Sequence, residues 1–310
     1  MTYRFKTLYK VIAVLGVLIA SPSSAHATVN IFACTPEWAA LAEDIGGAHV
    51  KVKSATTAQQ DVHHIRAKPS LLAAMRQADL VFCTGASLEI GWLPILVKKA
   101  GGPNVQPETE GWLMAADYVE KIGMMEHADR SMGHVHPEGN PHIHLNPHNI
   151  LTIAEVLSTR LALIDPDHRA DYQANFARFS DAWDKNIVTW QKQGAMLNGQ
   201  KFVVYHNAWA YLLNWLNMDA AASLEPKPGI PPSAAHLEKL LTTLKGQNVR
   251  AIIVTPYENR KAAEWLSTRL NIPILDLPFT VGGNTEATNL TRLFDVTLGT
   301  LTAQKVHKNE

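Results

Sequence analysis

The sequence predicts an α/β protein of two lobes joined by one long helix. From residue 29 onward, short apolar runs alternate with amphipathic segments, which is typical of βαβ units around a mainly parallel sheet. The alternation stops at residues 149–197, which favour helix, and restarts at residue 201. Two α/β-rich halves separated by a helical stretch indicate two lobes with a cleft between them.

The first half of the chain contains three predicted strands and three predicted helices. Pro69 stands where the first turn of a helix accepts proline. The strands are predicted at Val29–Ala33, His49–Lys53 and Leu80–Cys83. The helices are predicted at Glu37–Ile45, Ser70–Gln77 and Leu88–Lys99. Residues 103–148 are rich in Pro, Gly, Met and His, and only short elements are expected there.

Between the halves, Asn149–Leu163 and roughly Asp167–Leu197 are predicted to be helical. The second stretch has no proline and no glycine before Gly194, and its apolar residues recur at spacings of three and four. A helix of about 30 residues is about 45 Å long. Because one small lobe needs less than that to cover its sheet, we interpret this helix as a rigid connection between the lobes.

The second half repeats the α/β pattern with four predicted strands and four predicted helices. The strands are Lys201–Tyr205, Ala220–Leu224, Arg250–Val254 and Ile272–Leu275. The helices are Ala208–Leu216, Ser233–Gln247, Lys261–Leu270 and Glu286–Leu301. The predicted division is a leader at 1–27, a first lobe at 28–165, a connecting helix at 166–197 and a second lobe at 198–310.

The first 27 residues have the pattern of a cleavable export signal. Basic residues precede an apolar run at Val11–Ala20, and Ala25-His26-Ala27 places small residues where a signal peptidase cuts. The apolar run is shorter than the roughly 18–20 residues that span a bilayer. We therefore expect cleavage after Ala27 and a soluble mature protein in the periplasm.

Composition excludes several classes of partner and points to a metal. The 28 basic and 28 acidic residues balance, which argues against nucleic acid or an anionic membrane as partner. Two cysteines cannot form a four-cysteine zinc site. Six of the 14 histidines fall within residues 127–148, and a His-rich loop near 127–140 is a compositional signal of metal binding. These six are His127, His134, His136, His142, His144 and His148.

Potential ligands lie in loops that follow predicted strands, where open parallel sheets bind their ligands. They are His63, His64, His142, His144, His206 and Asp276. Three imidazoles and one carboxylate would form a closed tetrahedral site that suits Zn²⁺. Because adjacent residues of an extended segment face opposite ways, one of His63 and His64 is expected to coordinate.

Four motifs, in order, resemble the periplasmic zinc- and manganese-binding proteins of ABC transporters. They are Asp61-Val62-His63 with Lys68-Pro69-Ser70, Ala78-Asp79-Leu80 with Gly85 and Glu89, Pro141-His142-Ile143-His144-Leu145-Asn146-Pro147, and Val203-Val204-Tyr205-His206-Asn207-Ala208. The resemblance implies two four-stranded α/β lobes, one metal between them, a membrane permease as partner and no enzymatic activity. Matched by position, it implies His63, His142 and His206 as ligands.

The fourth ligand differs among members of this family. Some members place a Glu ligand after the strand in the region 250–256, where this chain has Thr255. Others use an Asp after the next strand, and that position matches Asp276. His144 stands where members often have Trp, so either histidine of the pair 142 and 144 could point inward. Three histidines and one aspartate favour zinc, because manganese prefers more carboxylate oxygen. His134 and His136 are expected to be accessory loop ligands, beside His64 and His144.

Three further expectations concern a disulfide, the transported metal and enzymatic activity. If the strands that Cys34 and Cys83 end are neighbours, as in the family, a disulfide between the two residues is feasible. A monomer that captures zinc reversibly is the main hypothesis, and a manganese or iron carrier, or an adhesin, of the same fold is the alternative. A zinc hydrolase is disfavoured, because a His-Glu-x-x-His segment is absent from the sequence and Asp276 would fill the position that a catalytic water needs.

Overall fold

The computed structural model describes residues 28–125, 133 and 135–303, which form two α/β lobes. Each lobe has a four-stranded parallel sheet, and the two sheets have equivalent strand orders, β2-β1-β3-β4 and β6-β5-β7-β8. The first sheet comprises β1 (Val29–Ala33), β2 (Val50–Ser54), β3 (Leu80–Cys83) and β4 (Trp112–Met114). The second comprises β5 (Lys201–Val204), β6 (Asp219–Ser223), β7 (Val249–Val254) and β8 (Ile274–Asp276). The predicted fold class is confirmed.

One strand was not predicted by the sequence. β4 pairs in parallel with β3, Val81 opposite Trp112, and completes the first sheet from within the stretch expected to hold only short elements. Its three residues are too few to establish an alternating pattern, so its position depends on the edge of β3 rather than on its own sequence.

The helices of the first lobe are α1 (Pro36–Gly46), α2 (Pro69–Gln77), α3 (Leu93–Ala100) and α4 (Pro147–Ile164). Those of the second lobe are α6 (Ala210–Trp215), α7 (Ala234–Leu244), α8 (Lys261–Leu270) and α9 (Leu290–Ala303), and α5 (Arg169–Gly194) joins the lobes. Two of these helices, α3 and α9, start at least four residues later than predicted. Before α3, residues 86–92 form turns, in which the amide N–H groups of Leu88 and Trp92 donate to the carbonyls of Gly85 and Glu89. Before α9, the Asn284 side chain accepts the amide N–H groups of Glu286 and Ala287 in a turn.

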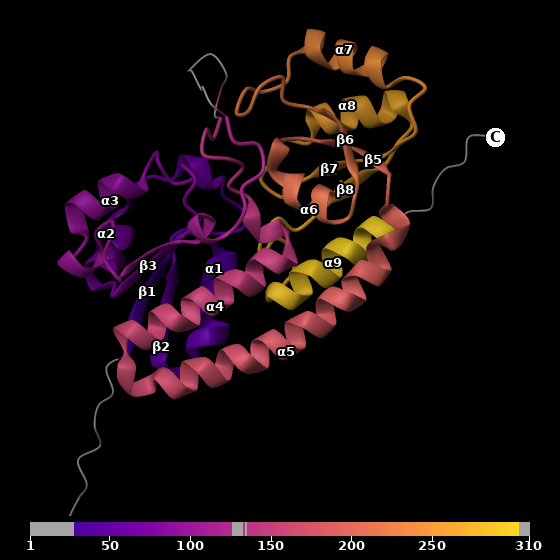
Figure 1. Cartoon of the computed structure of the whole chain (residues 1–310). Coiled ribbons are helices and arrows are strands. Elements are labelled where there is room, and N and C mark those ends of the chain that lie inside the picture. Colours follow the sequence, from indigo (N-terminus) through magenta and orange to yellow (C-terminus); the bar gives the residue numbers. More distant parts are fainter. Residues whose placement is uncertain (1–27, 126–132, 134, 304–310) are drawn as a thin grey trace, which may run out of the picture.

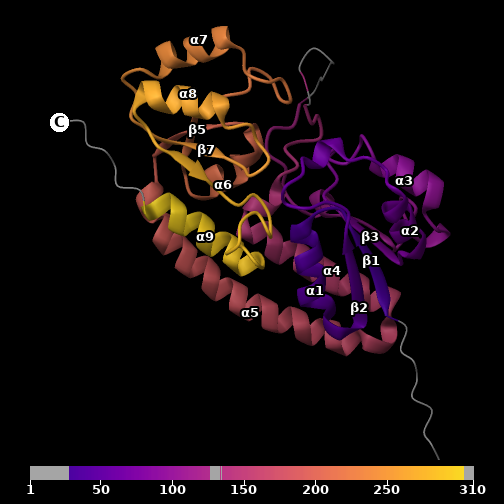
Figure 2. The ribbon, with the colours of Figure 1, turned by 180° about the vertical axis from the view of Figure 1, so that it is seen from behind.

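Helix α5 runs along both lobes (Figures 1 and 2). It packs against α1 and α4 of the first lobe and against α9 of the second. Two buried indoles fix it at these contacts: Trp183 Nε1 donates to the carbonyl of Pro147 at 2.8 Å, and Trp190 Nε1 donates to Asp295 Oδ1 at 2.9 Å. The 26 residues span about 39 Å, and this helix therefore fixes the lobes relative to each other. Among the described residues, no helix is both long and apolar enough to cross a membrane.

The largest apolar core is shared by the two lobes. It contains Ile31 and Phe82 from the first sheet as well as Phe202 and Ile253 from the second. Two smaller clusters cover the other face of each sheet. Because one continuous core lies beneath both sheets, the edges where their strands end are held at a fixed separation, and the loops beyond them face a common cleft.

Candidate metal centre

His63 is presented by a short turn whose geometry is set by the residue two positions earlier. Asp61 accepts the backbone N–H of His63 at 2.9 Å, and the same oxygen lies 2.7 Å from His63 Nδ1. Burial raises the pKa of the Asp61 carboxyl, but its hydrogen bonds with His63 and the charge of that imidazole outweigh the effect and lower the pKa to about 2. An ionised Asp61 therefore occupies Nδ1 and directs Nε2 toward the cleft.

His206 is held in the same way in the second lobe. It lies just beyond β5, and its Nδ1 is 2.8 Å from Glu225 Oε2. Glu225 itself lies just beyond the neighbouring strand, β6. The loops at the C-terminal ends of β5 and β6 thus supply both the imidazole and the carboxylate that orients it. Metal-binding histidines are commonly oriented in this way.

His142 lacks such a carboxylate. Its ring is 1 % exposed, and both ring nitrogens are buried with no hydrogen-bond partner among the described residues. Burial, followed by the positive charge of His206 and His63, lowers the pKa of His142 well below its usual range. A buried polar atom without a partner costs about 1–3 kcal/mol, so this neutral imidazole is a candidate metal ligand.

The three rings form an almost equilateral triangle between the lobes. Ring centroids are 5.8 Å apart for His63 and His142, 5.9 Å for His63 and His206, and 5.7 Å for His142 and His206. One nitrogen of each lies within 4.8 Å of the others. Tetrahedral zinc with Zn–N bonds of about 2.0–2.1 Å separates its nitrogens by roughly 3.4 Å, so modest rotations of the rings would close the site on an ion.

A fourth imidazole reaches this triangle from the His-rich stretch. His136 Nε2 lies 3.1 Å from His63 Nε2, and its ring centroid is 6.4 Å from that of His142. His136 was predicted only as an accessory ligand, because no predicted strand or helix directly precedes it to indicate where its side chain points. His134 lies outside the described residues.

The structure does not bring the other predicted ligands to the triangle. Asp276 ends β8 with its side chain 61 % exposed and paired with the guanidinium of Arg260. The His64 side chain is 60 % exposed and lies 3.8 Å from Asp61 Oδ2. His144 is buried, and its Nε2 contacts the carbonyl oxygen of Phe279 at 2.9 Å. Of the pair at 142 and 144, His142 is therefore the one that faces the cleft.

A cavity of about 190 Å³ opens beside His63 and His206. Its walls come from both lobes and comprise Asp61, His63, Tyr205, His206, Glu225, Gly229, Tyr257, Glu258 and Asn259. Burial raises the pKa of Glu258 to about 8, although Oε2 accepts the N–H of Thr255 at 2.7 Å. Asp61 was predicted only as part of a motif, and Glu225 and Glu258 were not predicted to belong to the site. The strand-end rule that selected His206 selects Glu225 equally well, because it directly follows the predicted strand 220–224.

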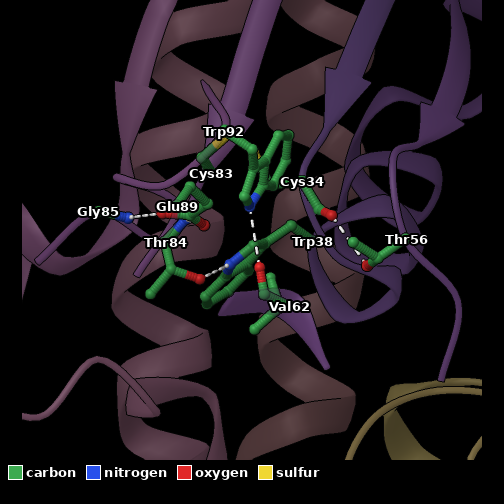
Figure 3. Close-up of a disulfide and its surroundings, with 9 residues drawn as sticks. All are labelled: Cys34, Trp38, Thr56, Val62, Cys83, Thr84, Gly85, Glu89 and Trp92. Atoms are coloured by element: carbon green, nitrogen blue, oxygen red, sulfur yellow. Dashed lines mark hydrogen bonds between the residues drawn. A yellow bond between two sulfur atoms is a disulfide. The ribbon is translucent and has the colours of Figure 1, made fainter. Parts of the chain in front are cut away.

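A disulfide joins Cys34 and Cys83, as predicted, and the loop that carries His63 is anchored beside it (Figure 3). Both cysteines are fully buried where the neighbouring strands β1 and β3 end. Trp92 packs in the same cluster, and its Nε1 donates to the carbonyl of Val62 at 2.8 Å, next to His63. A carboxylate oxygen of Glu89 lies within 4.8 Å of the two sulfurs, but sulfurs joined to each other leave no thiolate to hold an ion.

Two α/β lobes with one ion-sized cluster of imidazoles between them define a solute-binding protein for a metal ion. The family model of ZnuA, the periplasmic component A of a zinc-uptake complex, matches residues 31–303. The chain belongs to this family. It is therefore a substrate-binding protein of a metal ABC transporter and not an enzyme, and its family implies a divalent metal ion and a transporter permease as partners.

Named relatives carry different metals. A metal ABC transporter substrate-binding lipoprotein, SsaB of Streptococcus sanguinis, is 24 % identical over 81 % of this chain and 80 % of its own length. The manganese ABC transporter lipoprotein PsaA of Streptococcus pneumoniae is 24 % identical over 77 % and 76 %. The high-affinity zinc uptake protein ZnuA of Yersinia pestis is 26 % identical over 63 % and 65 %.

Solved structures share the fold. A crystal structure of ZnuA superposes with a TM-score of 0.74 at 23 % identity, covering 89 % of this chain and 99 % of that one. A periplasmic metal-binding protein from Candidatus Liberibacter asiaticus gives 0.72 at 17 % identity over 89 % and 99 %. The two-lobed architecture is thus that of known metal-binding proteins.

Proposed function

We propose that this protein captures Zn²⁺ between its lobes and delivers it to the permease of an ABC importer. The observation that carries the proposal is the triangle of His63, His142 and His206, in which two rings are oriented by carboxylates and the third is buried without a partner among the described residues. Such a site is built to hold an ion, since the empty state leaves buried nitrogens unsatisfied.

The donor atoms favour zinc over manganese. Asp61 and Glu225 contact the far nitrogens of the rings rather than the centre of the triangle, so nitrogen atoms face the ion. Imidazole suits zinc, whereas manganese prefers carboxylate and water oxygens. A manganese or iron carrier of the same family remains the alternative, and the metal titration below separates them.

The fourth ligand is proposed to be His136 rather than Asp276. We expect His136→Ala to weaken zinc binding at least tenfold, or about 1.4 kcal/mol, because its Nε2 lies beside that of His63 at the triangle. Asp276→Asn should change affinity less than twofold, because that carboxylate is exposed and paired with Arg260. Competition titration of both variants measures this. The reverse result would restore Asp276 as the fourth ligand.

The proposed function is tested by stripping the protein with chelator and titrating Zn²⁺ and Mn²⁺ against an indicator. Wild type should bind one zinc per chain tightly and manganese poorly, and His206→Ala should weaken zinc binding at least a hundredfold. His236→Ala is the matched control: this histidine contacts Ser223 O at 3.3 Å and lies outside the triangle, so affinity should not change. Tight manganese binding would favour the alternative carrier, and unchanged zinc binding by His206→Ala would refute the site.

The proposed compartment is the periplasm, after removal of residues 1–27, which lie outside the described residues. A buried disulfide supports an oxidising compartment. The mature chain is proposed to act as a monomer, because the metal site is assembled from the two lobes of one chain.

A further inference from the structure

A buried polar contact joins the two lobes beside the metal triangle. On the side of the first lobe are Glu37, in the first turn of α1, and His144, and these residues are 3 % and 2 % exposed. On the side of the second lobe are Phe279 and Thr280, each 6 % exposed, in the loop after β8. Polar side chains are seldom buried so completely unless they are paired.

The contacts form a closed set. Thr280 Oγ1 donates to Glu37 Oε2 at 2.5 Å, and His144 Nε2–H donates to the carbonyl oxygen of Phe279 at 2.9 Å. His144 Nδ1 lies 3.6 Å from Glu37 Oε1, which ties the two side chains of the first lobe to each other. Two successive residues of the second lobe, Phe279 and Thr280, are therefore hydrogen-bonded to two side chains of the first lobe.

Phe279, whose carbonyl accepts the His144 hydrogen bond, also contacts the proposed ligand His142. Its ring meets His142 edge-on with a centroid separation of 5.3 Å, and it meets His144 in the same way at 5.0 Å. His63 and His206 have carboxylates that fix their rings, whereas the ring nitrogens of His142 have no hydrogen-bond partner among the described residues. Packing must therefore orient His142, and Phe279 supplies an aromatic face of that packing.

We propose that Glu37, His144 and Thr280 form an interlobe latch that positions His142 by holding Phe279 against it. This inference rests on the proposed function, because it concerns how the same site retains its ion. The three latch residues are positioning residues, since they act on the ligand through Phe279. With the latch intact, the His142 ring stays aligned and the ion leaves slowly. With the latch broken, the loop after β8 can shift and the ring can turn away.

The latch is tested by the rate at which zinc passes from the loaded protein to an excess of chelator. Thr280→Val removes the hydroxyl and keeps the shape, and His144→Phe removes the hydrogen bond and keeps an aromatic ring. Each should release zinc at least tenfold faster than wild type. Thr280→Ser restores the hydroxyl and should release zinc within twofold of the wild-type rate.

A second readout separates positioning from general loss of stability. Co²⁺ bound in place of zinc reports ligand geometry through its visible absorption bands, which should shift in Thr280→Val and return in Thr280→Ser. Ser158→Ala is the matched control, because it removes another buried hydroxyl, bonded to Tyr172 O at 3.1 Å, away from the lobe interface. It should lower the melting temperature and leave release rate and spectrum unchanged.

The outcomes distinguish the latch from the function on which it rests. If wild type binds zinc tightly through His206 but Thr280→Val keeps the wild-type release rate and Co²⁺ spectrum, the latch is refuted and the zinc site stands. If His206→Ala binds zinc as wild type does, the proposed function is refuted, and the latch, which rests on it, is overturned with it.

Discussion

Replacing His142 with leucine is expected to abolish tight zinc binding and yet leave the metal-free protein at least as stable as wild type. Leucine has a similar volume and no polar atoms, so it removes two buried nitrogens that lack a partner among the described residues. The gain should be about 1–3 kcal/mol in the free energy of unfolding. Zinc affinity should fall at least a hundredfold, about 2.7 kcal/mol, and saturating zinc should no longer raise the melting temperature.

The same variant should change how stability depends on pH. Because the folded-state pKa of His142 is lowered, the unfolded chain binds the extra proton first as the pH falls below about 6.5, the ordinary value. Wild type should therefore lose about 1 kcal/mol relative to His142→Leu between pH 6.5 and 5.5. Urea unfolding of both metal-free proteins at pH 7.5, 6.5 and 5.5 measures the difference.

A histidine elsewhere in the fold provides the control for this experiment. His168 is also buried, but its Nδ1 lies 2.7 Å from Asp165 Oδ2. His168→Leu breaks that pair and should lower stability while zinc affinity stays the same. A metal-free His142→Leu protein that is clearly less stable than wild type would mean that groups within the protein satisfy the ring nitrogens of His142.

Removing the disulfide by the double change Cys34→Ala and Cys83→Ala should lower the free energy of unfolding by about 4 kcal/mol. The bond closes a loop with a sequence separation of 49, and the chain-entropy model gives about that value for a loop of this length. Urea unfolding of the metal-free protein measures the loss. Zinc affinity should fall much less than in the ligand variants, because the ligands themselves are intact.

Trp92→Phe is the companion variant for the disulfide. It keeps the disulfide and an aromatic ring but removes the hydrogen bond to the carbonyl of Val62, and it should cost about 1 kcal/mol. A loss below 1 kcal/mol in the double cysteine variant would contradict the entropic account and would indicate that the two strands are already held together by their cluster of apolar side chains.

The strand-end rule, together with the motifs, anticipated much of the site. His206 lies at the start of the loop after β5, so the end of that strand determines its position. His63 was placed by the motif that begins at Asp61. The periodicity of the sequence alone likewise predicted α5, because apolar residues at spacings of three and four over such a length are typical of a helix.

The strand-end rule has a limit at Asp276. A strand end fixes where a residue lies but not which way its side chain turns, because a register shift of one residue reverses the face. The position of Asp276 in the chain resembled that of a ligand, and its partner Arg260 comes from the start of α8, a contact that no local pattern announces. His136 was predicted only as an accessory loop ligand, since irregular backbone carries no periodicity from which the direction of a side chain can be inferred.

The carboxylates of Asp61 and Glu225 also have an electrostatic consequence. Each lies behind a proposed ligand ring, within 2.8 Å of a ring nitrogen. A divalent cation held by neutral imidazoles brings two positive charges, which the two carboxylates cancel. The occupied cleft would then be electroneutral and the vacant one anionic. The electrostatic potential at the opening of the cleft would therefore differ between the two states. A permease could distinguish them by this potential, even though α5 and the shared core allow the lobes little relative movement.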